Sequence, residues 1–115
     1  MKFPFGSVVL ANFNDGKGKE VKKIRPCIVF SSDMLNEYSS YRLLFPLTSD
    51  LANCNPIKFS IHPNSRNNIK VVSACMCDQF RSVDTARIIS ELGMISQDVI
   101  AQMYRALDIL TGRSR

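Results

Sequence analysis

The sequence predicts a mainly β protein, a small antiparallel barrel or curled sheet closed by one C-terminal α-helix. Its 115 residues are a typical length for one domain, and 45% of them are hydrophobic, which is enough for one modest core. Five or six short β-rich runs alternate with turn residues, and only the last stretch has clear helical periodicity. We therefore expect a single domain over residues 1–115.

The first two strands are expected at residues 5–13 and 25–31. Both runs are apolar at successive positions, which is typical of strands that are covered on both faces. The segment between them contains two glycines and an aspartate, residues that favour turns. Ser32 then begins a polar stretch that predicts a turn or a short capped helix.

Three more strands are expected at residues 41–47, 57–61 and 69–80. Pro46 lies within the first of these and predicts that this end lies at a sheet edge or a bulge, because proline has no N–H to donate. Residues 57–61 alternate apolar and polar side chains, which predicts a half-exposed strand. A polar turn at 62–68 separates this strand from 69–80, the longest β run.

The chain is expected to end with a short strand and one helix. The strand is predicted at residues 88–92, where Gly93 closes it. The helix is predicted at 96–111, with Ser96 as its N-cap and Gly112 as its C-cap. An apolar stripe at helical spacing indicates that this helix packs across the open side of the sheet. The stripe consists of Val99, Ile100, Met103, Ala106, Leu107 and Leu110.

The formal net charge of +5 is concentrated at the start of the chain. The first 25 residues hold six Lys or Arg against two acids. Most of these cations precede the second strand, and they are Lys17, Lys19, Lys22, Lys23 and Arg25. A concentrated basic patch predicts a phosphate-bearing partner. A solvated hairpin loop is the alternative that charge alone leaves open.

The cysteines and the single histidine do not indicate a metal centre. Cys75 and Cys77 would share one face of a strand, but Cys27, Cys54 and His62 have no regular ligand spacing relative to them. We expect reduced thiols that pack as small hydrophobes, and a surface position for His62.

Several classes of protein are excluded by what the sequence lacks. It has no apolar run near 18 residues and no signal-peptide pattern, so we expect a cytoplasmic protein without membrane contact. It has no acidic cluster for Mg²⁺ and no glycine-rich phosphate-binding motif. Any hydrolysis is therefore expected to need neither a metal nor a cofactor.

Polar residues that no core requires fall at three predicted strand ends. These groups are Arg25, Thr48-Ser49 and Asp78-Gln79-Phe80-Arg81. In an antiparallel sheet the start of one strand lies beside the end of its neighbour, so Arg25 and Thr48 can be neighbours. RNA cleavage needs a cation for the charge that develops on phosphate, a base for the 2′-hydroxyl and an acid for the leaving oxygen. Arginine suits the first role because its planar fork binds two phosphate oxygens.

The chain resembles the MazF/PemK/Kid family of toxin endoribonucleases from type II toxin–antitoxin modules. The matching segments keep their order over almost the whole chain, and they are residues 6–10, 18–20, 25–29, 46–49, 78–84 and 92–96 with the final helix. The resemblance implies an SH3-like small barrel (MazF/PemK/CcdB-like) with a C-terminal helix, forming a homodimer. It also implies metal-independent cleavage of single-stranded RNA by 2′-OH attack, which leaves a cyclic phosphate and a 5′-hydroxyl.

The same resemblance implies roles for individual residues. Arg25 would be the central acid/base and phosphate-stabilising residue, Thr48 would hold the scissile phosphate, and Asp78 would be the third catalytic residue. The expected RNA-binding residues are Lys17, Lys19, Glu20, Lys22, Lys23, Ser49, Gln79 and Arg81. An acidic, partly disordered antitoxin segment is expected over the basic groove.

The chain departs from the family pattern at three places. Val21 stands where the family usually has Gln, Met76 where some members have Arg, and Lys19 where some have His. These departures favour a mechanism centred on Arg25 and Thr48. Two alternatives stay open, a non-catalytic gyrase-binding toxin of the CcdB-like kind and a degenerate member that only binds RNA.

Overall fold

The computed structural model describes residues 1–13 and 24–114. Its elements are β1 (Ser7–Asn12), β2 (Ile24–Val29), α1 (Asp33–Tyr38), β3 (Tyr41–Thr48), β4 (Lys58–Ile61), β5 (Ser73–Met76), η1 (Cys77–Gln79), β6 (Arg81–Asp84), η2 (Thr85–Arg87), β7 (Ile88–Met94) and α2 (Gln97–Leu110). No helix among the described residues has the length and apolar character that crossing a membrane requires.

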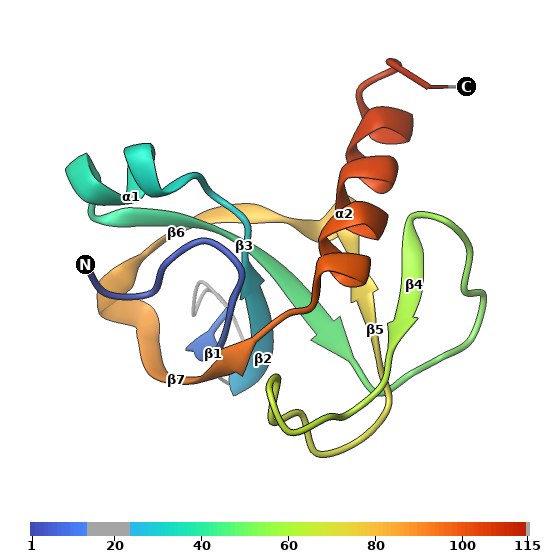
Figure 1. Cartoon of the computed structure of the whole chain (residues 1–115), viewed down its shortest axis with the longest axis horizontal. Helices are drawn as coiled ribbons and strands as arrows, with labels where there is room; N and C mark the ends of the chain where they lie inside the picture. The colour runs from blue at the N-terminus through green and yellow to red at the C-terminus, as the bar shows by residue number, and fades with distance from the viewer. Residues whose placement is uncertain (14–23, 115) are drawn as a thin grey trace, which may run out of the picture.

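The strands form one curled antiparallel sheet in the order β4-β5-β3-β2-β1-β7. β3 is its centre, because it pairs with β2 on one side and with both β6 and β5 on the other. The sheet curls so that the chain passes from β6, which pairs with β3, through η2 to β7, the far edge strand, which pairs with β1 (Figure 1). The predicted small barrel with a C-terminal helix is confirmed.

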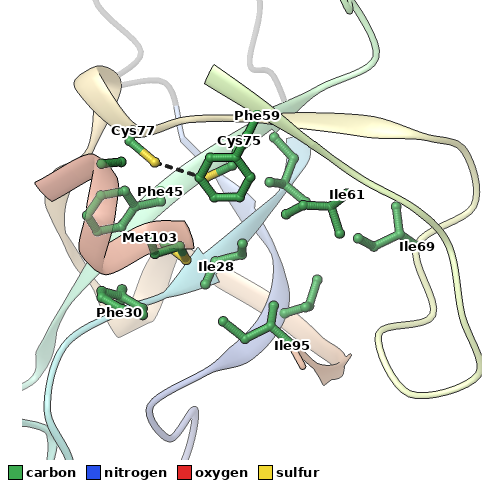
Figure 2. Packing of buried hydrophobic residues seen from close by; sticks show 13 residues of the cluster. Ile28, Phe30, Phe45, Phe59, Ile61, Ile69, Cys75, Cys77, Ile95 and Met103 are labelled. Atoms are coloured by element: carbon green, nitrogen blue, oxygen red, sulfur yellow. Dashed lines mark hydrogen bonds between the residues drawn. The ribbon is translucent and has the colours of Figure 1, made fainter. Parts of the chain in front are cut away.

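Two hydrophobic clusters cover the two faces of the central strands. Because successive side chains of a strand point to opposite faces, Val8 and Ile28 enter one cluster while Val9 and Val29 enter the other. Both faces of these strands are therefore covered, as their continuous apolar runs predict. α2 lies over the first cluster, where Met103 is fully buried close to the aromatic rings (Figure 2).

The helix caps are those that the sequence predicts. The Ser96 Oγ accepts a hydrogen bond of 3.3 Å from the Val99 N–H, and Gly112 takes a left-handed φ of +81° after the last turn. Ser32 caps α1 in the same way, since its Oγ accepts from the Leu35 N–H at 3.2 Å. In the apolar stripe of α2, Met103 and Ala106 are buried and Val99, Ile100 and Leu107 are partly buried against the first cluster, whereas Leu110 is 37% exposed at the end of the helix.

The long strand predicted at residues 69–80 is wrong. Residues 69–72 precede β5, and the chain then bends at Met76 (φ −91°, ψ 84°) into η1 and continues as β6. Because of the bend, one continuous β-prone run pairs with β3 twice. β5 pairs with Leu47 and Thr48, and β6 pairs with residues 41–44, the first half of β3. Local β propensity does not encode that change of partner.

The edge position predicted for Pro46 is also wrong. Pro46 is buried and pairs with Cys27 of β2, so this part of β3 is inside the sheet. On its other side β3 pairs with β6 as far as Leu44 and with β5 from Leu47 onward. The residue that lacks an N–H therefore lies where β3 changes partner, and the sheet accommodates it there.

Gly93 does not close the last strand, because β7 continues to Met94. A Cβ at position 93 would overlap the carbonyl oxygen of Arg66 and lie 2.9 Å from the carbonyl carbon of Asn67. The Met94 N–H also donates to the Arg66 carbonyl at 2.9 Å. The glycine is thus required because the turn after β4 packs directly on the backbone of β7.

Arg42 is a buried cation that the sequence reading did not single out. Its guanidinium donates to the backbone carbonyls of Lys2, Phe3, Ser39 and Tyr41 at 2.8–3.1 Å. These bonds attach the N-terminal segment to the start of β3, and they satisfy a charge that burial would otherwise make costly.

All four cysteines are free thiols, and Cys54 is the exposed one. The Sγ atoms of Cys75 and Cys77 lie 3.7 Å apart in the core (Figure 2). Burial raises the pKa of Cys27 to about 12, although the charge of Arg25 lowers it in part. Within the described ranges no three His, Cys, Asp or Glu side chains are grouped so that they could hold a metal ion.

Alkylation should therefore separate Cys54 from the other three cysteines. The thiolate is the nucleophile, and both burial and a raised pKa keep Cys27 protonated at neutral pH. We expect iodoacetamide at pH 8 to modify Cys54 quickly and the buried thiols only after addition of denaturant. Peptide mass spectrometry over a time course measures this. Equal rates at Cys54 and Cys27 in the folded protein would contradict the burial.

Candidate functional site

A cavity of about 480 Å³ lies where β2 begins and β3 ends. Three predicted site residues line it, namely Arg25, Thr48 and Ser49. Its other lining residues are Leu10, Ile24, Pro26, Leu47, Asn68, Ile69, Lys70, Val71, Ser73 and Leu92. The volume is in the range of small-molecule and cofactor sites in proteins.

Strand register places Arg25 beside Thr48. β2 and β3 pair antiparallel with Cys27 opposite Pro46, so two further residues along each strand bring Arg25 opposite Thr48. Arg25 also pairs with Ala11 of β1, which holds its backbone between two strands. Pro26 favours an extended conformation at the preceding residue and so supports this position of Arg25.

The Thr48 hydroxyl is oriented by its own turn. Its Oγ1 accepts a hydrogen bond of 3.1 Å from the Asp50 N–H. A hydroxyl that accepts in this way still has its own hydrogen to donate. Thr48 can therefore donate to an anionic oxygen in the cavity, and the half-buried Arg25 can bind the same group with its guanidinium.

Charge and polarity make the cavity suited to an anion with an apolar part. It holds two cations, Arg25 and Lys70, and none of the described residues that line it is acidic. Much of the remaining lining is apolar, as at Leu10, Leu47 and Leu92. A phosphate ester that carries a flat organic group has both properties.

One wall of the cavity was missed by sequence reasoning. Residues 68–71, which we call the second wall, precede β5 and line the cavity together with Ser73. Most of this segment belongs to residues 69–80, for which the sequence predicts one long strand. The signal that could have found it is the run of Asn and Ser at residues 64–68, which favours an ordered turn.

Asp78, Gln79 and Arg81 do not line the cavity. Since β5 runs antiparallel to β3, the residues after β5 follow β3 away from Thr48, and Arg81 pairs with Leu44. Asp78 and Gln79 are exposed in η1. The Arg81 guanidinium carbon lies 5.0 Å from the centre of the Phe13 ring, within cation–π range.

The predicted basic segment cannot be placed relative to the cavity. Lys17, Lys19, Glu20, Lys22 and Lys23 lie outside the described residues, and so does the departure at Val21. Met76, the other departure, is half-buried at the end of β5. His62 is exposed, as predicted.

Comparisons with known proteins agree on one family. The model of the "PemK-like, MazF-like toxin of type II toxin-antitoxin system" family matches residues 5–111. The chain is 26% identical to Endoribonuclease MazF of Staphylococcus epidermidis over 110 residues, which cover 93% of this chain and 89% of that protein.

Solved structures agree with the sequence matches. The structure of MazE-MazF from Deinococcus radiodurans is similar with a TM-score of 0.78 and 27% identity, covering 99% of this chain and 100% of that one. A mycobacterial endoribonuclease in complex with its cognate antitoxin has a TM-score of 0.77 at 16% identity, covers 97% of each chain and supports the fold alone. The predicted barrel fold is thus shared with solved MazF structures.

Proposed function

This chain belongs to the family of PemK-like, MazF-like toxins of type II toxin–antitoxin systems, and from that premise we propose that it is an endoribonuclease that cleaves single-stranded RNA without a metal. The observation that carries the proposal is the register of β2 and β3, which brings Arg25 and Thr48 into one cavity with no acidic lining residue among those described. Relatives named endoribonuclease MazF support RNA cleavage rather than the gyrase-binding alternative.

The proposed chemistry uses Arg25 and Thr48 on the scissile phosphate. The guanidinium binds two phosphate oxygens, and the Thr48 hydroxyl donates to one of them, so that charge developing on these oxygens is stabilised. The 2′-hydroxyl loses its proton as its oxygen attacks phosphorus, the bond to the 5′-oxygen breaks, and that oxygen takes up a proton, so the step neither gains nor loses protons overall. The products are a 2′,3′-cyclic phosphate and a 5′-hydroxyl.

Arg25 and Thr48 do not by themselves account for the proton that leaves the 2′-hydroxyl and the proton that the 5′-oxygen takes up. A guanidinium stays protonated in proteins, which suits Arg25 to stabilising charge rather than to taking the 2′-hydroxyl proton. The resemblance gives Arg25 the acid/base role, and in some family members an acidic residue at the position of Asp78 is the proposed base. That role for Asp78 stays a prediction, because Asp78 does not line the cavity. We propose Gln79 and Arg81 for contacts with nucleotides further along β3.

The proposal is tested with a long single-stranded RNA in excess EDTA. We expect cleavage at a limited set of sequences, with 5′-hydroxyl and cyclic phosphate ends identified by ligation and mass spectrometry. RNA carrying a 2′-deoxy nucleotide at the mapped site should resist cleavage, because the nucleophile is then missing. Intact RNA at micromolar protein, or cleavage that needs Mg²⁺, would refute the proposed function.

We further propose an antitoxin, a second copy of this chain and the cytoplasm as its partners and location. Similar folds occur in the solved structures of MazE-MazF and of a mycobacterial endoribonuclease in complex with its cognate antitoxin. An acidic segment would be attracted to the cavity by Arg25 and Lys70 and would exclude RNA from it. The basic segment at residues 17–23 would add to this attraction and to RNA binding, which should weaken with salt.

A further inference from the structure

We infer that the second wall, residues 68–71, holds one unstacked base of the RNA beside the scissile phosphate, and that Asn68 and Lys70 select this base. The inference rests on the proposed function, since it places base choice next to the Arg25–Thr48 pair in the same cavity. It assigns sequence selectivity to a part of the chain that neither the family motif nor the basic segment includes.

The second wall is held rigidly by an asparagine-rich turn. Asn67 is 2% exposed, and its Oδ1 accepts from the N–H groups of Asn64 and Ile69 at 3.1 and 3.0 Å. Its Nδ2 donates to the His62 carbonyl at 3.0 Å. The Asn64 Oδ1 in turn accepts from the N–H groups of Arg66 and Asn67 at 2.9 and 2.8 Å. A turn with this many internal bonds is a preorganised support for a binding residue.

The turn is also attached to β7, which completes the cavity. The Met94 N–H donates to the Arg66 carbonyl at 2.9 Å, and Gly93 allows the two backbones to meet. The Asn68 side chain donates to the Leu92 carbonyl at 2.6 Å. Asn68 and Leu92 both line the cavity, so this bond fixes the position of the Asn68 amide at the site.

This bond determines what Asn68 offers to a ligand. Because its partner is a carbonyl oxygen, the bonded atom must be Nδ2, and the amide then presents Oδ1 as an acceptor. The backbone of Asn68 has a left-handed φ of 54°, which asparagine tolerates better than most residues. The exposed Lys70 adds an ammonium donor two residues later.

An acceptor and a donor beside an apolar lining match a nucleobase. The two faces of a base lose water favourably against apolar side chains such as Leu47 and Ile69, and its polar edge needs hydrogen-bonding groups. Val71 also lines the cavity, and because it is 55% exposed, its apolar surface is available to the face of a base. The cavity is larger and more apolar than a phosphate alone would need.

The test compares cleavage maps of matched variants on a random-sequence RNA library in EDTA. Lys70→Gln removes the donor, and Arg66→Gln is its control, because Arg66 is exposed in the same turn and its side chain does not line the cavity. Asn68→Gly removes the acceptor without straining the positive φ. Asn53→Gly is its control, because Asn53 has a φ of 62° on a different loop.

We expect Lys70→Gln and Asn68→Gly each to relax the preference at one position beside the cleaved bond by roughly tenfold, as loss of a base-edge contact does. Both controls should give the wild-type map. Active variants with unchanged maps would overturn the inference and leave the proposed function intact, whereas a wild type that cleaves nothing would overturn both. Since Lys70 is exposed, its variant decides the matter if Asn68→Gly fails to fold.

Discussion

Replacing Arg25 with alanine is expected to lower the single-turnover cleavage rate on saturating RNA by about 10³-fold, in line with the loss of one preorganised charge-stabilising donor. Arg25 and Thr48 line the same cavity, because the register of β2 and β3, extended by two residues, brings the two positions opposite each other. Arg25→Lys should recover only part of the rate, because an ammonium cannot bind two phosphate oxygens in one plane. Quenched-flow cleavage of a short RNA with one mapped site gives these rates.

Three measurements distinguish lost chemistry from lost structure or lost binding. Arg25 is half-buried at the cavity rather than in either hydrophobic cluster, so Arg25→Ala should keep a thermal midpoint close to the wild-type value. Arg66→Ala removes an exposed arginine outside the cavity and should cleave like the wild type. An RNA affinity that falls less than the rate would place the effect in the transition state. Full activity of Arg25→Ala would remove the basis of the proposed function.

Replacing Gly93 with alanine is expected to destabilise the protein by about 2–3 kcal/mol, the range for forcing extra atoms into a packed site. The added Cβ would overlap the Arg66 carbonyl oxygen, and that neighbour is backbone rather than a flexible side chain. The turn must therefore move away from β7. For a chain of this size the thermal midpoint should fall on the order of 10 °C in calorimetry.

Gly112→Ala is the matched control for this prediction. Gly112 has a φ of +81°, but a Cβ there would meet no heavy atom within 4 Å. Its replacement should cost only the backbone strain of a left-handed alanine, about 1 kcal/mol. Gly93→Ala should also disturb base selectivity, because the second wall is attached to β7 at this point. Equal losses of stability in the two variants would show that the close approach at Gly93 is not the cause.

Local signals predicted much of the fold, and three of the predicted site residues, Arg25, Thr48 and Ser49, line one cavity. The alternation at residues 57–61, the continuous apolar runs of β1 and β2 and the caps at Ser96 and Gly112 were readable because each depends on neighbours in the chain. The antiparallel arrangement of β2 and β3 was also enough to predict that Arg25 and Thr48 lie at the same end of the two strands, where both line the cavity. The lysines of the basic segment remain predictions.

The sequence predictions that were wrong or missing concern features that depend on contacts between distant parts of the chain. The β-prone run at 69–80 is not one strand, because β5 within it and β6 after it both pair with the same side of β3. The antiparallel register of these pairs moves Asp78 away from Thr48. The burial of Arg42 could not be read from the sequence, because two of its acceptors are backbone carbonyls of the distant N-terminal segment, at Lys2 and Phe3.

The sequence by itself therefore determined a barrel of short strands with a capped terminal helix and a family, whereas the catalytic roles of Arg25 and Thr48 stay predictions. Only the tertiary structure decided what completes their cavity. Gly93 looks like a strand end until β7 is seen against the backbone of Arg66, and the turn at 62–68 looks like a plain connection until its asparagines are seen to bond one another. Propensity and spacing act over a few residues, whereas a cavity wall depends on which distant backbones meet.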